Sequence, residues 1–115
     1  MHADFMLSQL NTRGPVTLLK VSGRLDAVAA QELRKHCLDV RQQGHKHLAL
    51  DLSAVSFVAS SGIGTLLALT EEFGKDGVLY LAPISLPVRS VIQLLNLEPY
   101  LAIYESLEEA IAVLR

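Results

Sequence analysis

The chain has 115 residues, a formal net charge of −2 and a single cysteine, Cys37. This length suits one domain, residues 1–115, and the near-neutral charge with only three Phe, three Tyr and no Trp argues against direct nucleic-acid binding. A lone thiol cannot form an internal disulfide, no uncharged apolar run is long enough to span a membrane, and the first residues lack a signal-peptide pattern. We therefore expect a cytoplasmic protein without a membrane span.

Short apolar runs alternate with amphipathic segments along the chain. The runs that predict strands are Phe5–Leu10, Val16–Val21, His47–Leu52, Val78–Ala82 and Leu101–Tyr104. The first two are joined by the turn-forming residues 11–15 and can pair as a hairpin. Val55–Val58 is a further apolar run, which follows the predicted end of a strand at Asp51–Ser53.

Four helices are predicted from capping residues and apolar spacing. The first starts after Asp26, a good N-cap, and the second opens at the turn Ser60–Gly64. The third is capped by Ser85, and the fourth starts at a capping box formed by Ser106 and Glu109. The core-facing side chains are Ala30, Leu33, Cys37 and Val40 in the first helix, Ile63, Leu66, Leu67, Leu69 and Phe73 in the second, Val88, Val91, Ile92 and Leu95 in the third, and Leu107, Ala110, Ile111 and Leu114 in the fourth.

The resulting order, β-β-α-β-α-β-α-β-α, predicts an α/β fold with a sheet of four or five mostly parallel strands and about four helices. Crossovers between parallel strands are expected to be right-handed. In such a sheet, functional groups gather where strands end and helices begin. In this chain those places are Gly23–Asp26, Asp51–Ser53 and Ala59–Gly64.

The turn Ser60-Ser61-Gly62-Ile63-Gly64 is the most informative of these places. Its serines lie just before a helix N-terminus, and Gly62 and Gly64 leave the backbone open to close approach by another molecule. A phosphate there would meet free amides and the positive end of the helix dipole. The simpler interpretation is that one serine is the N-cap of the helix. Since a cap is also exposed, the two interpretations are compatible.

Two carboxylates are candidates for chemistry near Ser60. Asp26 and Asp51 can converge as an acidic pair, which would suit a metal ion or a general base. The interpretation we favour makes Asp26 an N-cap and gives Asp51 a strand-end turn. No motif supports a Ser-His-Asp hydrolase, because the sequence around Ser60 is Ala-Ser-Ser-Gly rather than Gly-x-Ser-x-Gly.

A zinc hypothesis rests on four residues, His36, Cys37, His45 and His47. Cys37 falls on the predicted buried face of its helix and no second ligand pair is evident, so no bound metal is expected. The glycines do not form a nucleotide-binding loop either, since Gly64 is followed by Thr65 where such a loop needs Lys. We therefore expect no cofactor.

Three motifs, in this order along the chain, resemble those of a known family. They are Gly23-Arg24-Leu25-Asp26, the strand that ends in Asp51-Leu52-Ser53, and Phe57-Val58-Ala59-Ser60-Ser61-Gly62-Ile63-Gly64. With them the chain resembles a STAS domain, the module of bacterial anti-sigma factor antagonists, over nearly its whole length. The resemblance implies a STAS-like fold.

The resemblance also implies a role in a partner-switching pathway. In the family, a serine protein kinase that doubles as the anti-sigma factor phosphorylates the first serine of the last motif, and a serine phosphatase reverses the reaction. The unmodified antagonist binds the anti-sigma factor and so frees the sigma factor. The phosphorylated serine would be Ser60, preceded by Ala59 where the family most often has Asp. The expected partner-binding residues are Asp26, Asp51, Ser60, Ser61, Gly62 and Gly64.

Two other hypotheses stay open. One is a non-phosphorylated STAS subunit or scaffold of a larger complex, such as a membrane lipid-transport assembly. The other, weaker one is a small hydrolase that uses Asp51 and Ser60. Because no catalytic motif supports the hydrolase, we expect the chain to act by binding a partner rather than as an enzyme.

Overall fold

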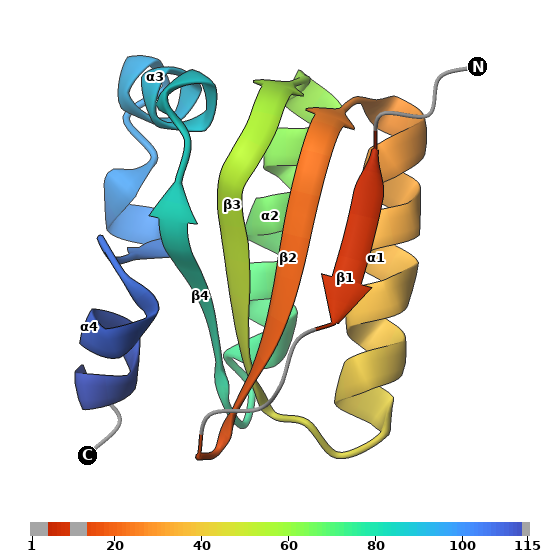
Figure 1. The fold of residues 1–115 in the computed structure, drawn as a ribbon, viewed down its shortest axis with the longest axis vertical. Helices are drawn as coiled ribbons and strands as arrows, with labels where there is room; N and C mark the ends of the chain where they lie inside the picture. Colours follow the sequence, from red (N-terminus) through yellow and green to blue (C-terminus); the bar gives the residue numbers. More distant parts are fainter. Residues whose placement is uncertain (1–4, 10–13, 114–115) are drawn as a thin grey trace.

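The computed structural model describes residues 5–9 and 14–113 of the chain. These residues form a five-stranded sheet in the order β1-β2-β3-β4-β5 (Figure 1). Its strands are β1 Met6–Gln9, β2 Val16–Leu25, β3 His47–Val58, β4 Val78–Ile84 and β5 Ala102–Ile103. β1 runs antiparallel to β2, and every later neighbour is parallel. The expected mostly parallel α/β sheet is confirmed.

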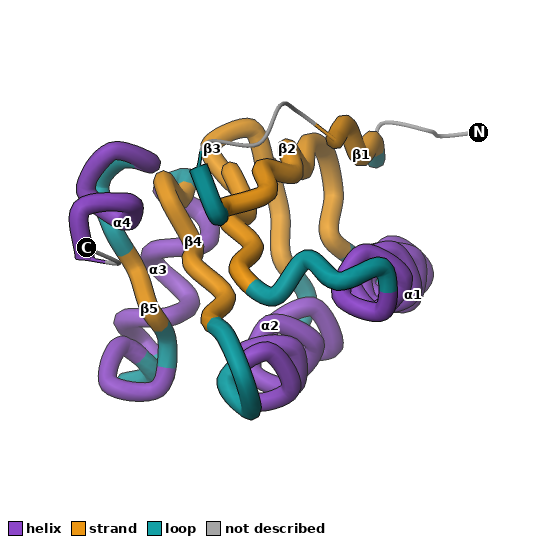
Figure 2. Tube along the Cα trace, turned by 90° about the horizontal axis from the view of Figure 1, so that it is seen from below, coloured by secondary structure: helices purple, strands orange, loops and turns teal. Residues whose placement is uncertain are grey.

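Helices follow the strands in the predicted order. They are α1 Ala27–Gln42, α2 Ser60–Phe73, α3 Leu86–Leu94 and α4 Leu107–Val113, with a 3₁₀ turn, η1, at Glu98–Tyr100. Figure 2 shows α1 and α2 side by side on one face of the sheet, and α4 near its β4–β5 edge. No helix within the described ranges combines the length and apolarity that crossing a membrane requires.

Two apolar clusters hold these layers together. The larger lies between the sheet and the helices α1, α2 and α3, and it contains Leu33, Leu50 and Leu66, each fully buried. The smaller lies on the opposite face, where Ala110 of α4 packs with Tyr80 of β4. Strand residues therefore alternate between two apolar surroundings, which explains the nearly continuous apolar runs in the sequence.

Capping side chains fix the starts of three of these helices. The carboxylate of Asp26 accepts from the Ala29 amide at 3.0 Å, as predicted for α1. The hydroxyl of Ser85 accepts from the Val88 amide at 3.4 Å at the start of α3. The predicted capping box of α4 forms in a modified version: Ser106 Oγ accepts from the Glu109 amide at 3.2 Å, while the Glu109 carboxylate accepts from the Glu105 amide at 3.0 Å. In an ordinary capping box that second donor is the amide of the N-cap residue itself.

The largest difference from the sequence prediction concerns β3. The runs His47–Leu52 and Val55–Val58 belong to one strand, so Asp51–Ser53 is not a strand end. The neighbouring strand explains this, because β2 also continues, to Leu25, which pairs with Val58. Register irregularities along the β2–β3 pair absorb the interruption without ending the strands.

A second difference is at the end of α3. Leu95 was expected to face the core, but half of its surface is exposed (50%). The helix ends at Leu94 and Asn96 adopts φ 56°, which turns the chain so that Leu97 packs against the core instead. Val88 and Ile92 are buried as predicted. The predictions for Leu10, for residues 11–13 and for Leu114 fall outside the described residues.

Candidate functional site

The end of β2 and the start of α2 are joined by a backbone hydrogen bond. The amide of Ala59 donates to the carbonyl oxygen of Leu25 at 3.0 Å. Gly62, in the first turn of α2, is buried against the same place: a Cβ atom on it would lie 2.9 Å from the Leu25 carbonyl oxygen and 3.0 Å from Cγ2 of Val58. Only glycine allows this approach without a shift, so Gly62 serves the packing of the chain's own strand and helix.

Gly64 differs from Gly62 in its surroundings. It is exposed, and a Cβ atom on it would meet nothing within 4 Å. The expectation that both glycines leave the backbone open to another molecule is therefore wrong for Gly62, while Gly64 does lie on an accessible surface.

Ser60 and Ser61 occupy the first turn of α2, and both are exposed. The N-cap residue is Ala59, which has no side-chain capping bond, so the interpretation of a serine as the N-cap is wrong. The first helical hydrogen bond runs from the Ile63 amide to the Ala59 carbonyl at 3.1 Å. The amides before Ile63 in this turn therefore have no helical acceptor and create a region that favours negative charge.

Asp26 lies at the same end of the molecule. It follows Leu25 directly, as Ser60 follows Ala59, so the two residues flank the Leu25–Ala59 hydrogen bond. Its carboxylate is half-buried and engaged as the cap of α1. Neither α1 nor α2 has an acidic residue in its first turn. The structure therefore brings Asp26, Ser60 and Ser61 together, and the first turns of the two helices add no further carboxylate to this group.

Asp51 does not join this group. The rest of β3, residues 52–58, separates it from the end of the strand. Asp51 pairs with Lys20 and Val58 with Leu25, so five residues of β2 span this stretch, roughly 17 Å at the usual rise of an extended strand. Its carboxylate accepts from the amide and the hydroxyl of Ser53 at 2.9 and 2.6 Å. The structure thus provides no acidic pair of Asp26 with Asp51, and no hydrolase arrangement of Asp51 with Ser60.

The model of the STAS domain family matches residues 8–110. The chain belongs to the STAS domain family. Among curated proteins it resembles the anti-sigma-F factor antagonist RsfB of Mycobacterium tuberculosis, with 27% identity over 87% of this chain and 82% of that protein.

Solved structures of anti-sigma factor antagonists have the same fold as this chain. An anti-sigma factor antagonist from Mycobacterium paratuberculosis superposes with a TM-score of 0.81 and 28% identity, covering 94% of this chain and 93% of that one. The Bacillus cell fate determinant SpoIIAA in its phosphorylated form superposes with a TM-score of 0.67 and 26% identity, covering 96% and 99%. The STAS-like fold expected from the sequence motifs is confirmed.

Two residues of this STAS domain near Ser60 were not identified as site residues from the sequence. The guanidinium of Arg24 lies 4.3 Å from the centroid of the Phe57 ring, and both side chains are exposed. The two residues face each other because Gly23, with φ 90°, sits at a register shift after which Arg24 pairs with Phe57. That pairing depends on the strand register, and a sequence pattern alone does not give it.

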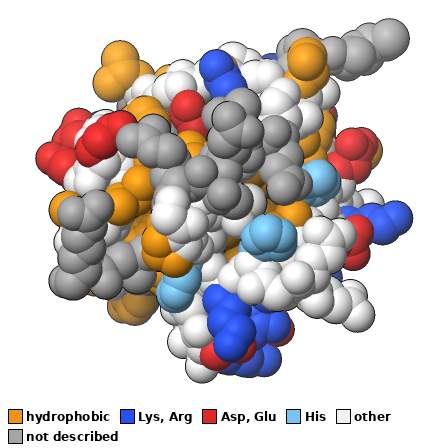
Figure 3. Space-filling model, turned by 60° about the horizontal axis from the view of Figure 1, so that its bottom comes forward, with side chains coloured by type: hydrophobic (Ala, Val, Ile, Leu, Met, Phe, Trp, Pro, Cys, Tyr) orange, Lys and Arg blue, Asp and Glu red, His pale blue; other side chains and the backbone are white. Residues whose placement is uncertain are grey.

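The residues of the zinc hypothesis do not come together in the STAS fold. Cys37 is fully buried in the core, and burial raises the pKa of its thiol to about 12. His45 Nδ1 lies 2.8 Å from the hydroxyl of the buried Thr17. Figure 3 shows the histidine side chains at the lower end of the molecule separated by other atoms. Over residues 5–9 and 14–113, no three His, Cys, Asp or Glu side chains are placed to hold a metal ion.

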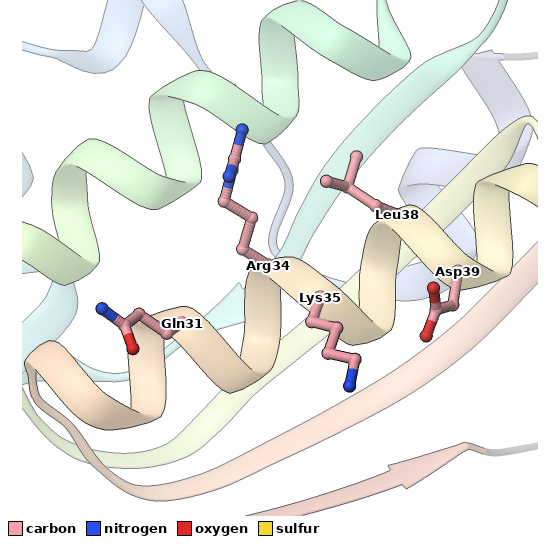
Figure 4. A pocket seen from close by; sticks show the side chains of 5 residues that line it. All are labelled: Gln31, Arg34, Lys35, Leu38 and Asp39. Carbon is pink, nitrogen blue, oxygen red and sulfur yellow. The ribbon is translucent and has the colours of Figure 1, made fainter.

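An open hollow of about 310 Å³ lies along α1, away from the predicted site residues. It is lined by Gln31, Arg34, Lys35, Leu38 and Asp39 (Figure 4). None of these residues belongs to the three family motifs, so the hollow is not part of the candidate site. The candidate site is instead an exposed surface around the first turn of α2.

Proposed function

We propose that this STAS domain is an anti-sigma factor antagonist that acts in the cytoplasm and is switched off by phosphorylation of Ser60. The observation that carries the proposal is the position of Ser60: its side chain is exposed, and it stands in the first turn of a helix whose N-cap, Ala59, makes no capping bond. Family membership and the names of the relatives support an anti-sigma factor as the partner. That this partner is also a serine protein kinase is part of the proposal.

In this function the chain is a substrate and a binding module, not an enzyme. The Ser60 hydroxyl oxygen attacks the γ-phosphorus of ATP held by the kinase, the bond to the ADP oxygen breaks, and the hydroxyl proton is released. A serine phosphatase hydrolyses the phosphoserine and restores the hydroxyl. The chain itself needs only to present an accessible hydroxyl, and the first turn of α2 does so.

The fold tolerates the phosphate, whereas the interface does not. The modification adds about −1.5 to −2 charges at a helix N-terminus, where the dipole favours negative charge. In a partner interface shaped for a hydroxyl, like charges about 4 Å apart repel by roughly 4 kcal/mol per unit pair at an effective dielectric near 20. Even a third of that energy, about 1.4 kcal/mol, weakens binding tenfold.

The partner surface that we propose is centred on Asp26, Ser60, Ser61 and Gly64 and continues along the outer side of α2. Two exposed apolar side chains border it, Val28 in the first turn of α1 (67% exposed) and Phe57 at the end of β3 (37% exposed). Apolar side chains next to exposed hydroxyls suit a protein interface better than a small-molecule site. Asp51 and the buried Gly62 are not part of this surface.

The experiment that tests the proposal is phosphorylation of the purified chain by the kinase of its own pathway. Intact-mass measurement after incubation with the kinase and ATP should show one added phosphate in the wild type and in Ser61→Ala, and none in Ser60→Ala. Phosphate on Ser60→Ala would contradict the assignment. Complete absence of phosphate on the wild type, with binding intact, would favour the non-phosphorylated scaffold.

A further inference from the structure

Arg24 is a cation next to the candidate site, and it has no carboxylate partner among residues 5–9 and 14–113. Its guanidinium stacks on the Phe57 ring at 4.3 Å, and this is the interaction that it makes within residues 5–9 and 14–113. Asp26, two residues away, uses its carboxylate to cap α1 rather than to pair with Arg24. The positive charge of Arg24 is therefore available at the surface.

The position of Arg24 relative to Ser60 follows from the Leu25–Ala59 hydrogen bond of 3.0 Å. Arg24 comes immediately before Leu25, and Ser60 comes immediately after Ala59, so the two exposed residues lie on neighbouring segments fixed by this bond. The burial of Gly62 against Leu25 holds the first turn of α2 in the same place. The backbone of Arg24 is thus held beside the phosphate-accepting turn. Its side chain starts on the sheet face opposite the buried Leu25, so it must swing around the end of β2 to meet a phosphate there.

We propose that, once Ser60 is phosphorylated, the guanidinium of Arg24 leaves the Phe57 ring and binds the phosphate. This inference rests on the proposed function, in which Ser60 accepts the phosphate. Arginine binds phosphate through two parallel charge-assisted hydrogen bonds. Such bonds are stronger than an exposed cation–π contact. The first turns of α1 and α2 contain no acidic residue that would compete for the guanidinium.

The movement changes the partner surface in two ways beyond adding a phosphate. It neutralises the positive charge of Arg24, and it uncovers the face of the Phe57 ring, which is 37% exposed with Arg24 stacked on it. An anti-sigma factor that recognises Arg24 stacked on Phe57 would therefore lose its contact with the guanidinium and meet a bare ring face when Ser60 is modified. The position of Arg24 would thus depend on the phosphorylation state of Ser60.

The test uses the full chain with phosphoserine placed at position 60 during translation, so that no kinase is needed. A ³¹P NMR pH titration measures the second pKa of the phosphate, which a bound guanidinium lowers because it favours the dianion. We expect this pKa to be lower in the wild type than in Arg24→Gln by about half a unit or more, with Arg24→Lys in between. Lys20→Gln is the matched control, since it removes an equal, exposed charge from the same strand, and it should leave the pKa near the wild-type value.

A second measurement follows the NMR signals of the Phe57 ring. The ¹H resonances of Phe57 should shift on phosphorylation in the wild type and stay in place in Arg24→Gln. Equal phosphate pKa values in the wild type and Arg24→Gln, or unchanged Phe57 resonances in the wild type, would overturn the inference. If the kinase fails to modify Ser60, the proposed function fails while this measurement still stands. If phosphate weakens partner binding but the second pKa of the phosphate is the same in the wild type and in Arg24→Gln, only the inference about Arg24 fails.

Discussion

The Ala59 amide and the Leu25 carbonyl oxygen are 3.0 Å apart, and this backbone hydrogen bond sets the first turn of α2 against the end of β2. It places residues from two distant parts of the sequence, Asp26 and Ser60, at one end of the molecule. The motif that ends in Asp26 and the motif that contains Ser60 each contribute residues to the surface that we assign to partner binding, and this contact holds the two motifs together.

Gly62 and Gly64 offer a matched pair of helix substitutions. Gly62→Ala should destabilise the fold by about 1–3 kcal/mol, because the new methyl group would sit 2.9 Å from the Leu25 carbonyl oxygen. Gly64→Ala has open space around the new methyl group, and should stabilise the fold by up to about 1 kcal/mol through helix propensity. Urea unfolding of both variants measures the difference. Equal stabilities would show that α2 does not pack on Leu25 as described.

Ala59 leaves α2 without a side-chain cap, and a carboxylate there should supply one. Ala59→Asp should stabilise the unmodified protein by about 1 kcal/mol, through a hydrogen bond to an amide of the first turn. Ala68→Asp, at an exposed position further along α2, is the control and should bring no gain. Thermal unfolding compares the three proteins. A gain in Ala68→Asp as large as in Ala59→Asp would exclude capping as the cause.

The thiol of Cys37 should be unreactive toward alkylating reagents in the folded protein. Burial raises the pKa of its thiol from 9.0 to about 12, so little thiolate forms near pH 8.5 and reagents cannot reach it. Alkylation followed by mass spectrometry should show modification only after denaturant is added. Fast alkylation of the native protein would contradict the buried position of this residue.

The same shift predicts a loss of stability in alkaline solution. The unfolded thiol ionises from about pH 9 upward while the folded thiol stays protonated, so the free energy of unfolding falls as pH rises from 9.0 toward about 12. Cys37→Ala should lose this part of the pH dependence. The buried Tyr80, whose pKa burial also raises, keeps its own contribution in both proteins. Identical pH profiles for the wild type and Cys37→Ala would contradict the prediction.

Local sequence signals predicted most of the fold. The caps Asp26, Ser85 and Ser106 act over a few residues, and their hydrogen bonds are present. The apolar spacing of α1 correctly predicted the burial of Leu33 and Cys37. These features depend on the helix period and on the chemistry of single turns, both of which can be read from one sequence.

The larger errors concern relations between segments. Asp51 and Ser53 have the composition of a turn, but pairing with β2 carries β3 through them to Val58. The approach of Gly62 to Leu25 and the stacking of Arg24 on Phe57 depend on tertiary packing and strand register. A local pattern contains neither, so the sequence suggested the serines of the candidate site but not Arg24.

The phosphorylation switch at Ser60 is tested most directly by the affinity of the chain for the anti-sigma factor of its pathway, measured by calorimetry. The unmodified chain and Ser60→Ala should bind alike, since neither carries a charge at position 60. The chain with phosphoserine at position 60 should keep its fold and bind at least about tenfold more weakly, and Ser60→Asp should be weakened in the same direction. Phosphoserine at position 61 provides the control for added charge alone and should have the smaller effect. Equal affinities for the unmodified chain and the chain phosphorylated on Ser60 would contradict the account.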